Sequence, residues 1–201
     1  MEKTFTIFAG NSILVTGPIE FVVRQAKRFV DSLSPEDTQR VAIFSDDSSH
    51  VLDIDFRGTE DEVVARLATH PLLSDGEPVV RGRGRPKLGV VGKEVSLLPR
   101  HWEWLSNQRG GASATLRRLV DEARKSTGKK DELRRLEEAA HRFMWDMAGN
   151  LPNFEEASRL FYQKRYGDFK HLVAQWPSDI AAHTFRLLNR IEAFLDAAKE
   201  A

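Results

Sequence analysis

Four cations within seven residues form the part of the chain best suited to binding a polyanion. The stretch 81–87 reads Arg-Gly-Arg-Gly-Arg-Pro-Lys. Glycine lets the backbone lie deep in a narrow groove, and proline prevents the stretch from continuing as a helix. Arginine is favoured in the narrow, strongly negative minor groove of A·T-rich DNA. This composition predicts an extended arm that lies in the minor groove of double-stranded DNA.

The core of this arm, residues 83–86, resembles an AT-hook, a short peptide that binds the minor groove. The resemblance implies that the contacting residues are Arg81, Arg83, Gly84, Arg85, Pro86 and Lys87. A basic linker between two domains has a similar Gly/Pro composition and is the alternative interpretation.

The charges of the chain are segregated, although its formal net charge is zero. Residues 79–130 contain 13 Lys and Arg against 4 Asp and Glu, a net charge of +9, whereas residues 1–78 contain 7 against 14, a net charge of −7. Such segregation is typical of a segment that binds a polyanion. An internal alternative is that the acidic first part docks on the basic middle.

Composition excludes several classes of protein. The 201 residues include no cysteine, so there is neither a disulfide framework nor a thiolate zinc site. No apolar run is long enough to span a membrane, and the N-terminus lacks a signal-peptide pattern. We therefore expect a cytoplasmic, nucleoid-associated protein with no membrane partner and no cofactor.

The elements around the arm predict an α+β fold in four segments. Residues 1–69 read as a small α/β domain in the order ββαββα, and residues 70–87 as the linker and arm. Residues 88–128 contain a short strand and two helices, and residues 129–201 an all-helical C-terminal domain. In the first segment, Pro18 is expected to open a helix, residues 51–56 alternate like a strand, and Thr59 and Glu62 have capping-box spacing.

The C-terminal segment has the apolar spacing of a helical bundle. Helices are expected at 129–148, 154–162, 166–175 and 178–198, the last with Ser178 as its N-cap. The expected core consists of Phe143, Met144, Met147, Phe154, Leu160, Phe161, Phe169, Leu172, Phe185, Leu188 and Phe194.

The basic middle contains a strand, a proline-initiated helix, a glycine turn and a second helix. The strand is residues 94–98, Pro99 begins the first helix, and Ser113 is expected to cap the second after Gly110 and Gly111. This order of elements at residues 92–126 resembles the ribbon-helix-helix modules of the Arc and MetJ type. In those proteins the strands of two chains pair into one ribbon that enters the major groove.

The ribbon-helix-helix resemblance implies a homodimer through the 93–98 strand, since a lone strand cannot form a ribbon. It also implies backbone contacts by the N-terminal amides of the second helix. The residues that match these roles are Lys93, Arg100, Gly111, Ala112, Ser113, Arg117 and Arg118.

One departure from the ribbon-helix-helix pattern concerns the surface that reads the bases. The family register assigns Lys93, Val95 and Leu97 to the DNA side, and Glu94, Ser96 and Leu98 to the inside. Apolar side chains contact only a thymine methyl group. Arg83 and Arg85 are therefore expected to supply most of the base preference.

Nearly the whole chain also resembles an uncharacterised bacterial family known as a domain of unknown function. The resemblance rests on the stretches 85–92, 98–105 and 110–113. It implies a bacterial source and no particular activity.

Residues with catalytic or metal-binding chemistry are few. The six histidines have no metal spacing, and the arm lacks the Gly-Lys-Ser/Thr of a nucleotide-binding loop. Asp53 and Asp55 would lie on one face of the 51–56 strand, as a solvated face or, alternatively, as an acid/base or metal pair. Of Trp102 and Trp104, which are two residues apart on a helix, one is expected in the core and one in an interface.

The sequence thus favours a dimeric bacterial DNA-binding protein, either a transcriptional regulator or a nucleoid-associated protein, that prefers A·T-rich duplexes. The main alternative is a regulatory adaptor, in which the 93–98 segment only dimerises and the basic segment binds an acidic protein surface. A protein partner for the N- or C-terminal domain is compatible with either function. RNA binding and a hydrolase built on Asp53 and Asp55 are ranked lower, and no enzyme activity is expected.

Overall fold

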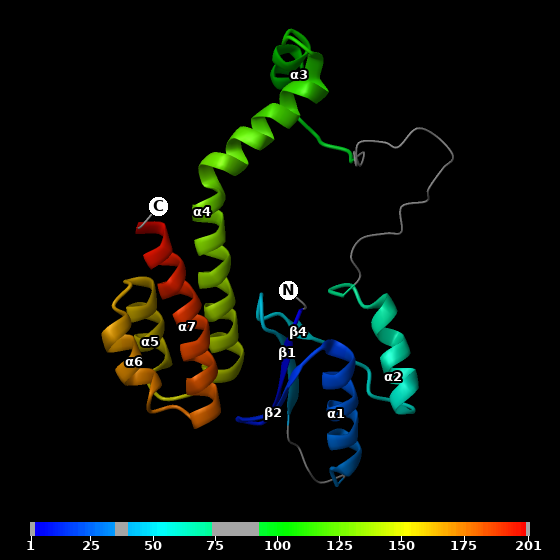
Figure 1. Ribbon diagram of the computed structural model, residues 1–201, viewed down its shortest axis with the longest axis vertical. Coiled ribbons are helices and arrows are strands. Elements are labelled where there is room, and N and C mark those ends of the chain that lie inside the picture. Colours follow the sequence, from blue (N-terminus) through cyan, green and yellow to red (C-terminus); the bar gives the residue numbers. More distant parts are fainter. Residues whose placement is uncertain (1–2, 35–39, 74–92, 200–201) are drawn as a thin grey trace. The chain divides into compact units, whose positions relative to one another are not determined.

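The computed structural model describes residues 3–34, 40–73 and 93–199 (Figure 1). The chain divides into two compact units, one of residues 1–75 with 132–201 and the other of residues 76–131. Each unit is described by itself.

The first unit is built on a four-stranded antiparallel sheet with the strand order β2-β1-β3-β4. The strands are β1 (Phe5–Ala9), β2 (Ser12–Gly17), β3 (Val41–Ser45) and β4 (Val51–Leu52). The β1-β2 hairpin turns at Gly10, whose φ of +55° favours glycine. The strands and helices of residues 5–66 follow the predicted order ββαββα, and the α+β fold class is confirmed.

Strand β4 is shorter than the alternation of residues 51–56 predicts. Only Val51 and Leu52 pair with β3, opposite Phe44 and Ile43. The sequence pattern of a strand therefore continues for four residues beyond the last backbone pairing, because Ile54 and Phe56 still pack against the core.

Helices cover both faces of the sheet (Figure 1). On one face, Ile7 and Ile43 pack against buried residues of α1 (Ile19–Ser32) and α2 (Glu60–Arg66), which is followed by the short helix η1 (Leu67–Thr69). On the other face, Phe8 and Phe44 pack into the helical bundle. Alternate side chains of a strand point to opposite faces, so strands buried on both sides must be apolar on both.

The ends of α1 and α2 match the predicted signals. Pro18 precedes α1 in an extended conformation. Thr59 caps α2 in a capping box, in which its hydroxyl accepts from the Glu62 N–H and the Glu62 carboxylate accepts from the Thr59 N–H.

The helical bundle consists of the C-terminal part of α4 (Gly111–Ala148) with α5 (Phe154–Tyr162), α6 (Tyr166–Val173) and α7 (Ser178–Lys199). The predicted core residues are all found in or against one cluster. Seven are buried and four are partly buried, the latter being Met147, Leu172, Phe185 and Phe194. The prediction of a bundle core is confirmed.

The N-terminal sheet and the C-terminal bundle share that cluster and belong to one compact unit. The sequence analysis treats them as separate segments, 1–69 and 129–201, and gives no sign of their association. Phe143 on α4 contacts Phe8 and Phe44, with ring centroids 5.4 and 5.2 Å apart. The Ile13 N–H also donates to the Asp179 carboxylate at 2.8 Å, which links β2 to the first turn of α7.

The second unit contains, in its described residues, α3 (Pro99–Ser106) and the first part of α4. Pro99 lies in the first turn of α3, as predicted. Gly110 and Gly111 have φ values of +90° and +74° and form the turn into α4.

Three local predictions for the second unit are wrong. The second helix begins at Gly111, so Ser113 lies in its first turn and is not the cap. The helix does not end near Gly128 but continues to Ala148, because a single glycine weakens a helix without stopping it. The predicted strand at 94–98 does not form, and residues 93–98 have no regular secondary structure. A single segment without a neighbouring strand has no backbone partner for a ladder.

The continuity of α4 at Gly128 can be tested by substitution. A Cβ atom at Gly128 meets nothing within 4 Å. Gly128→Ala should therefore stabilise the helix by about 1 kcal/mol. The measurement is helicity by circular dichroism together with urea unfolding.

Gly111→Ala serves as the matched control, because its Cβ atom also meets nothing but its φ is +74°. This variant should be destabilised by roughly 1–2 kcal/mol. A loss of helicity in Gly128→Ala would indicate that the helix breaks at this residue after all.

Candidate functional site

The six residues of the predicted minor-groove arm lie outside the described residues. Arg81, Arg83, Gly84, Arg85, Pro86 and Lys87 all belong to the stretch 74–92. Their role remains the prediction made from their composition and spacing.

The segment 93–98 exposes apolar side chains. Val95 is 56 % exposed and Leu98 is 50 % exposed, while Leu97 is half-buried. The family register places Val95 and Leu98 on opposite sides of a ribbon, and in the single chain neither side is covered. Lys93 at the start of this segment is exposed as well.

The first turn of α4 contains three of the predicted backbone-contacting residues. Gly111, Ala112 and Ser113 form the first turn of α4, where amide groups have no partner inside the helix. Arg100 is exposed in the first turn of α3. The positive end of the α4 dipole and the amides of Ala112 and Ser113 are suited to an anion, whereas the Gly111 N–H donates to the Gln108 carbonyl at 2.9 Å.

The first part of α4 is amphipathic and carries a cationic face. At 100° per residue, five cations fall within one half of the helix surface: Arg117, Arg118, Arg124, Lys125 and Lys129. Every residue from 117 to 130 is exposed. The cationic face extends over about 18 Å of the helix, at 1.5 Å per residue.

Two of these arginines make local contacts. Arg118 donates to the Glu122 carboxylate at 3.0 Å, and the Arg117 Nε donates to the Ser113 carbonyl at 3.2 Å. An exposed i,i+4 ion pair of this kind contributes only a few tenths of a kcal/mol, so it is easily exchanged for a phosphate.

The opposite face of α4 is apolar and also exposed. Leu119 and Val120 lie on it, and the Val120 side chain is 55 % exposed. On α3, Trp102 and Trp104 are both exposed, so the prediction that one of them is a core residue is wrong. The buried residue of α3 is Leu105, which follows directly after Trp104.

A buried polar cluster joins the sheet to α7 in the first unit. The Thr6 hydroxyl donates to the Asp46 carboxylate at 2.7 Å, and the Arg186 guanidinium donates to the same carboxylate at 2.8 Å. Arg190 donates to the Asp46 carbonyl, and Arg142 of α4 to the carbonyl of Ser48. These hydrogen bonds join residues of different elements, whereas the buried Ser49 hydroxyl in the same turn has no hydrogen-bond partner.

His183 lies at the centre of this cluster and is only 2 % exposed. Its ring stacks on Phe143 at 4.2 Å and meets Phe8 at 5.4 Å. Its Nδ1 lies 3.1 Å from an Arg186 nitrogen, and because a guanidinium only donates, the imidazole is the acceptor. Burial, followed by the charge of Arg186, lowers the pKa of His183 to about 4, so the ring is neutral at pH 7.

Sequence reasoning missed this cluster, because its members are up to 180 residues apart. One local signal exists on α7. His183, Arg186 and Arg190 are spaced by three and four residues, so they share one face of a helix that is otherwise apolar on that side. Polar residues on a core-facing side of a helix indicate buried partners elsewhere.

The predicted strand face of Asp53 and Asp55 does not form, because β4 ends at Leu52. Both side chains are exposed, and Asp55 binds Arg57 at 2.7 Å. Hydrogen bonds from Arg57 hold the pKa of Asp55 well below its usual range, which suits an ion pair and not a general acid. Among the described residues, no group of three or more acidic or histidine side chains is placed to hold a metal ion.

A comparison with protein families matched one family model, described as "Uncharacterized protein conserved in bacteria", over residues 4–188. The chain belongs to this family, DUF2239. The match confirms the full-length resemblance to an uncharacterised bacterial family. Comparisons with curated proteins and with solved structures found no match. Within the described ranges, none of the helices has the length and apolar character needed to cross a membrane.

The buried His183 makes the stability of the first unit depend on pH. The unfolded chain binds a proton at His183 below pH ~6.5, whereas the folded chain does so only near pH 4. The contribution of neutral His183 to the free energy of unfolding is therefore fully present above pH ~6.5 and is lost as the pH falls toward 4. Between pH 7.5 and 5 this loss amounts to about 2 kcal/mol, which urea unfolding at the two pH values measures.

His183→Phe keeps an aromatic ring beside Phe143 and removes the titration, so its unfolding free energy should change far less between the two pH values. His171→Gln, which alters an exposed histidine, is the control and should behave like the wild type. An equal pH dependence in His183→Phe would show that other groups cause the acid sensitivity.

Proposed function

We propose that this protein is a dimeric bacterial DNA-binding protein of the transcription-regulator or nucleoid-associated type. In this proposal the arm at 81–87 lies in the minor groove of A·T-rich DNA. The ribbon-helix-helix-like segment binds the adjacent backbone.

The observation that carries the proposal is the cationic face of α4. Five cations on one exposed face lie within a segment whose net charge is +9, while the preceding 78 residues have a net charge of −7. A long row of exposed cations is unfavourable for folding, since like charges repel, and is favourable when phosphates neutralise it. Double-stranded DNA presents one negatively charged phosphate per ~1.7 Å of its axis.

The arm contributes the expected base preference. Arg83 and Arg85 match the minor-groove pattern, whereas Val95 and Leu97 of the segment 93–98 cannot hydrogen-bond a base edge. The α4 face is suited to phosphates through its five cations, although Asp121 lies among them on the same face. Base preference and affinity are therefore assigned to different parts of the basic segment.

The exposed apolar residues of the second unit support the dimer. In its described part, only Leu105 and Thr115 are buried. A helical hairpin with so small a core is not stable by itself. A second copy that pairs along 93–98 would cover Leu98 and the apolar side of α4, as in the ribbon-helix-helix family, and would leave Val95 on the outer face of the ribbon.

One feature favours the adaptor function as a second candidate. Exposed apolar side chains at Val95 and Leu98 suit a protein interface at least as well as a DNA groove. In that case the basic segment binds an acidic protein surface. Nucleic-acid binding then does not depend on Arg83 and Arg85.

DNA binding is tested on A·T-rich and G·C-rich duplexes by fluorescence anisotropy over a salt series. Affinity should fall steeply with salt, with a slope of about −0.9 per phosphate contacted. Arg83→Ala with Arg85→Ala should remove the preference for A·T. Arg124→Ala with Lys125→Ala should weaken binding to both duplexes equally and reduce the slope by about 2.

Arg159→Ala with Arg165→Ala is the matched control, because it removes two exposed arginines from the helical bundle. It should bind DNA like the wild type. No binding to either duplex at ~50 mM salt would contradict the proposal. Unchanged binding in the Arg83/Arg85 variant would contradict the role of the arm and favour the adaptor.

The dimer is tested with two single proline variants, Val95→Pro and Ser96→Pro. Neighbouring N–H groups of a strand point in opposite directions, so one of these two residues donates across a paired ribbon. At least one variant should be monomeric in sedimentation equilibrium, while Ser96→Ala remains dimeric. A dimer that survives both prolines would mean that the chains do not pair through 93–98.

A further inference from the structure

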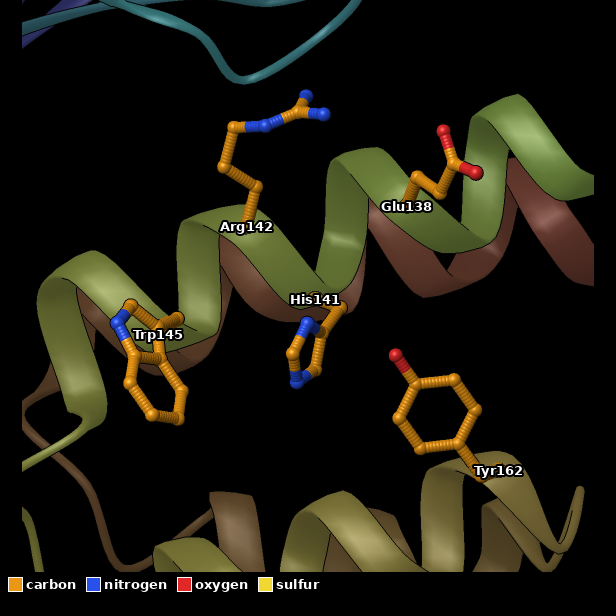
Figure 2. A pocket seen from close by; sticks show the side chains of 5 residues that line it. All are labelled: Glu138, His141, Arg142, Trp145 and Tyr162. Carbon is orange, nitrogen blue, oxygen red and sulfur yellow. The ribbon is translucent and has the colours of Figure 1, made fainter.

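A hollow lined by aromatic rings lies between α4 and α5, outside the basic segment. Glu138, His141, Arg142 and Trp145 of α4 and Tyr162 of α5 line it (Figure 2). The four α4 residues recur at three- and four-residue spacings, so they share one face of that helix. The hollow has a volume of about 270 Å³, enough for one small ligand or one side chain.

Three rings form the wall of the hollow. His141 lies between the other two, with centroids 6.2 Å from Trp145 and 5.3 Å from Tyr162. Figure 2 shows all three rings in the space between the two helices. Trp145 is 64 % exposed and Tyr162 is 59 % exposed, which is unusual for large aromatic side chains in a packed bundle.

The charges around the rings favour a cation over an anion. Burial raises the pKa of Tyr162, and the carboxylates of Glu137 and Glu138 raise it further, so the phenol lies in a negative field. Burial lowers the pKa of His141, so the imidazole adds no positive charge at neutral pH. Glu137 pairs with Lys164 at 3.6 Å, and the exposed Glu138 has a long 3.8 Å contact with Arg134.

Arg142 is the cation on the lining, and its contacts direct it elsewhere. Its guanidinium donates to the Ser48 carbonyl in the turn after β3. In Figure 2 it points away from the three rings. The Arg142 guanidinium therefore holds the sheet against the bundle and leaves the rings uncovered, while its charge still contributes to lowering the pKa of His141.

We propose that this hollow binds an organic cation, either a quaternary ammonium group or the guanidinium of an arginine side chain. Trp145 and Tyr162 would present their ring faces to the cation, and Glu138 would lie at the rim as its counter-ion. Each such cation–π contact at an exposed site strengthens binding roughly two- to fivefold. The site is independent of the proposed DNA binding, since none of its residues belongs to the basic segment.

The test compares choline with 3,3-dimethyl-1-butanol, which has the same shape and no charge. The full-length protein is titrated with each, and the indole N–H signal of Trp145 is followed by NMR. Choline should bind in the millimolar range and about tenfold more tightly than the neutral alcohol. Equal binding of the two would overturn the proposal, because the site would then be merely apolar.

N-acetyl-arginine amide and adenosine monophosphate complete the ligand set. Tighter binding of the arginine derivative than of choline identifies a protein side chain as the ligand, and the reverse identifies a free ammonium compound. Binding of the nucleotide in preference to both cations would overturn the proposal in favour of base stacking.

Variants test whether choline binds to the faces of the aromatic rings or only to apolar surface. Trp145→Leu keeps an apolar side chain and should lose choline binding, whereas Trp145→Phe should retain part of it. Glu138→Gln should weaken binding severalfold. Trp104→Ala, which removes an exposed tryptophan of α3, is the control and should bind choline normally, and unchanged binding in Trp145→Leu would contradict the site.

Discussion

The first unit depends on one constraint, which is that the central strands β1 and β3 carry buried side chains, nearly all apolar, on both faces. A strand of this kind cannot have one face in water, so it requires a layer of helices on each side. Helices α1 and α2 supply one layer from the N-terminal part of the chain. The second layer comes from residues 132–199, which explains why two segments separated by the basic middle fold into one compact unit.

The same constraint explains the buried polar cluster. Thr6 is a polar residue on the bundle side of a buried strand, and its hydroxyl needs partners that an apolar layer cannot supply. Asp46 and Arg186 provide these partners, and the Arg186 guanidinium also donates to the Nδ1 of His183. A satisfied network fixes the position of α7 on the sheet, because a displaced helix would leave several polar groups unpaired.

Local signals in the sequence predicted local structure well. The capping box at Thr59, the proline at the start of α3 and the apolar spacing of α5 each depend on residues within one or two turns. The wrong predictions concern structure that depends on contacts with distant residues, or the end of a helix that has no signal to terminate it. Val51 to Phe56 has the alternation of a strand, but backbone pairing ended at Leu52, and Gly128 lacked the left-handed conformation that ends a helix.

The candidate sites divide in the same way. The arm and the positive charge of the basic segment could be predicted from composition, because charge is visible without a fold. The cationic face could not, since Arg124, Lys125 and Lys129 join Arg117 and Arg118 only on the helix that α4 forms. The aromatic hollow could not be predicted from the sequence, since Tyr162 and Trp145 line one hollow only because α5 packs on α4. His141, Trp145 and Tyr162 carry no spacing that distinguishes them from bundle core residues until their exposure is known.

Helix α4 connects two regions with opposite requirements. From residue 132 onward it is held by buried side chains such as Leu136 and Phe143, whereas residues 117–130 are exposed on every side. An isolated helix of that length is only marginally stable in water. One face of this part of the helix is apolar, and an apolar protein surface would stabilise it. The other face is cationic, and a polyanion would stabilise it. Dimerisation and DNA binding are therefore expected to reinforce each other, because each orders the same helix that the other requires.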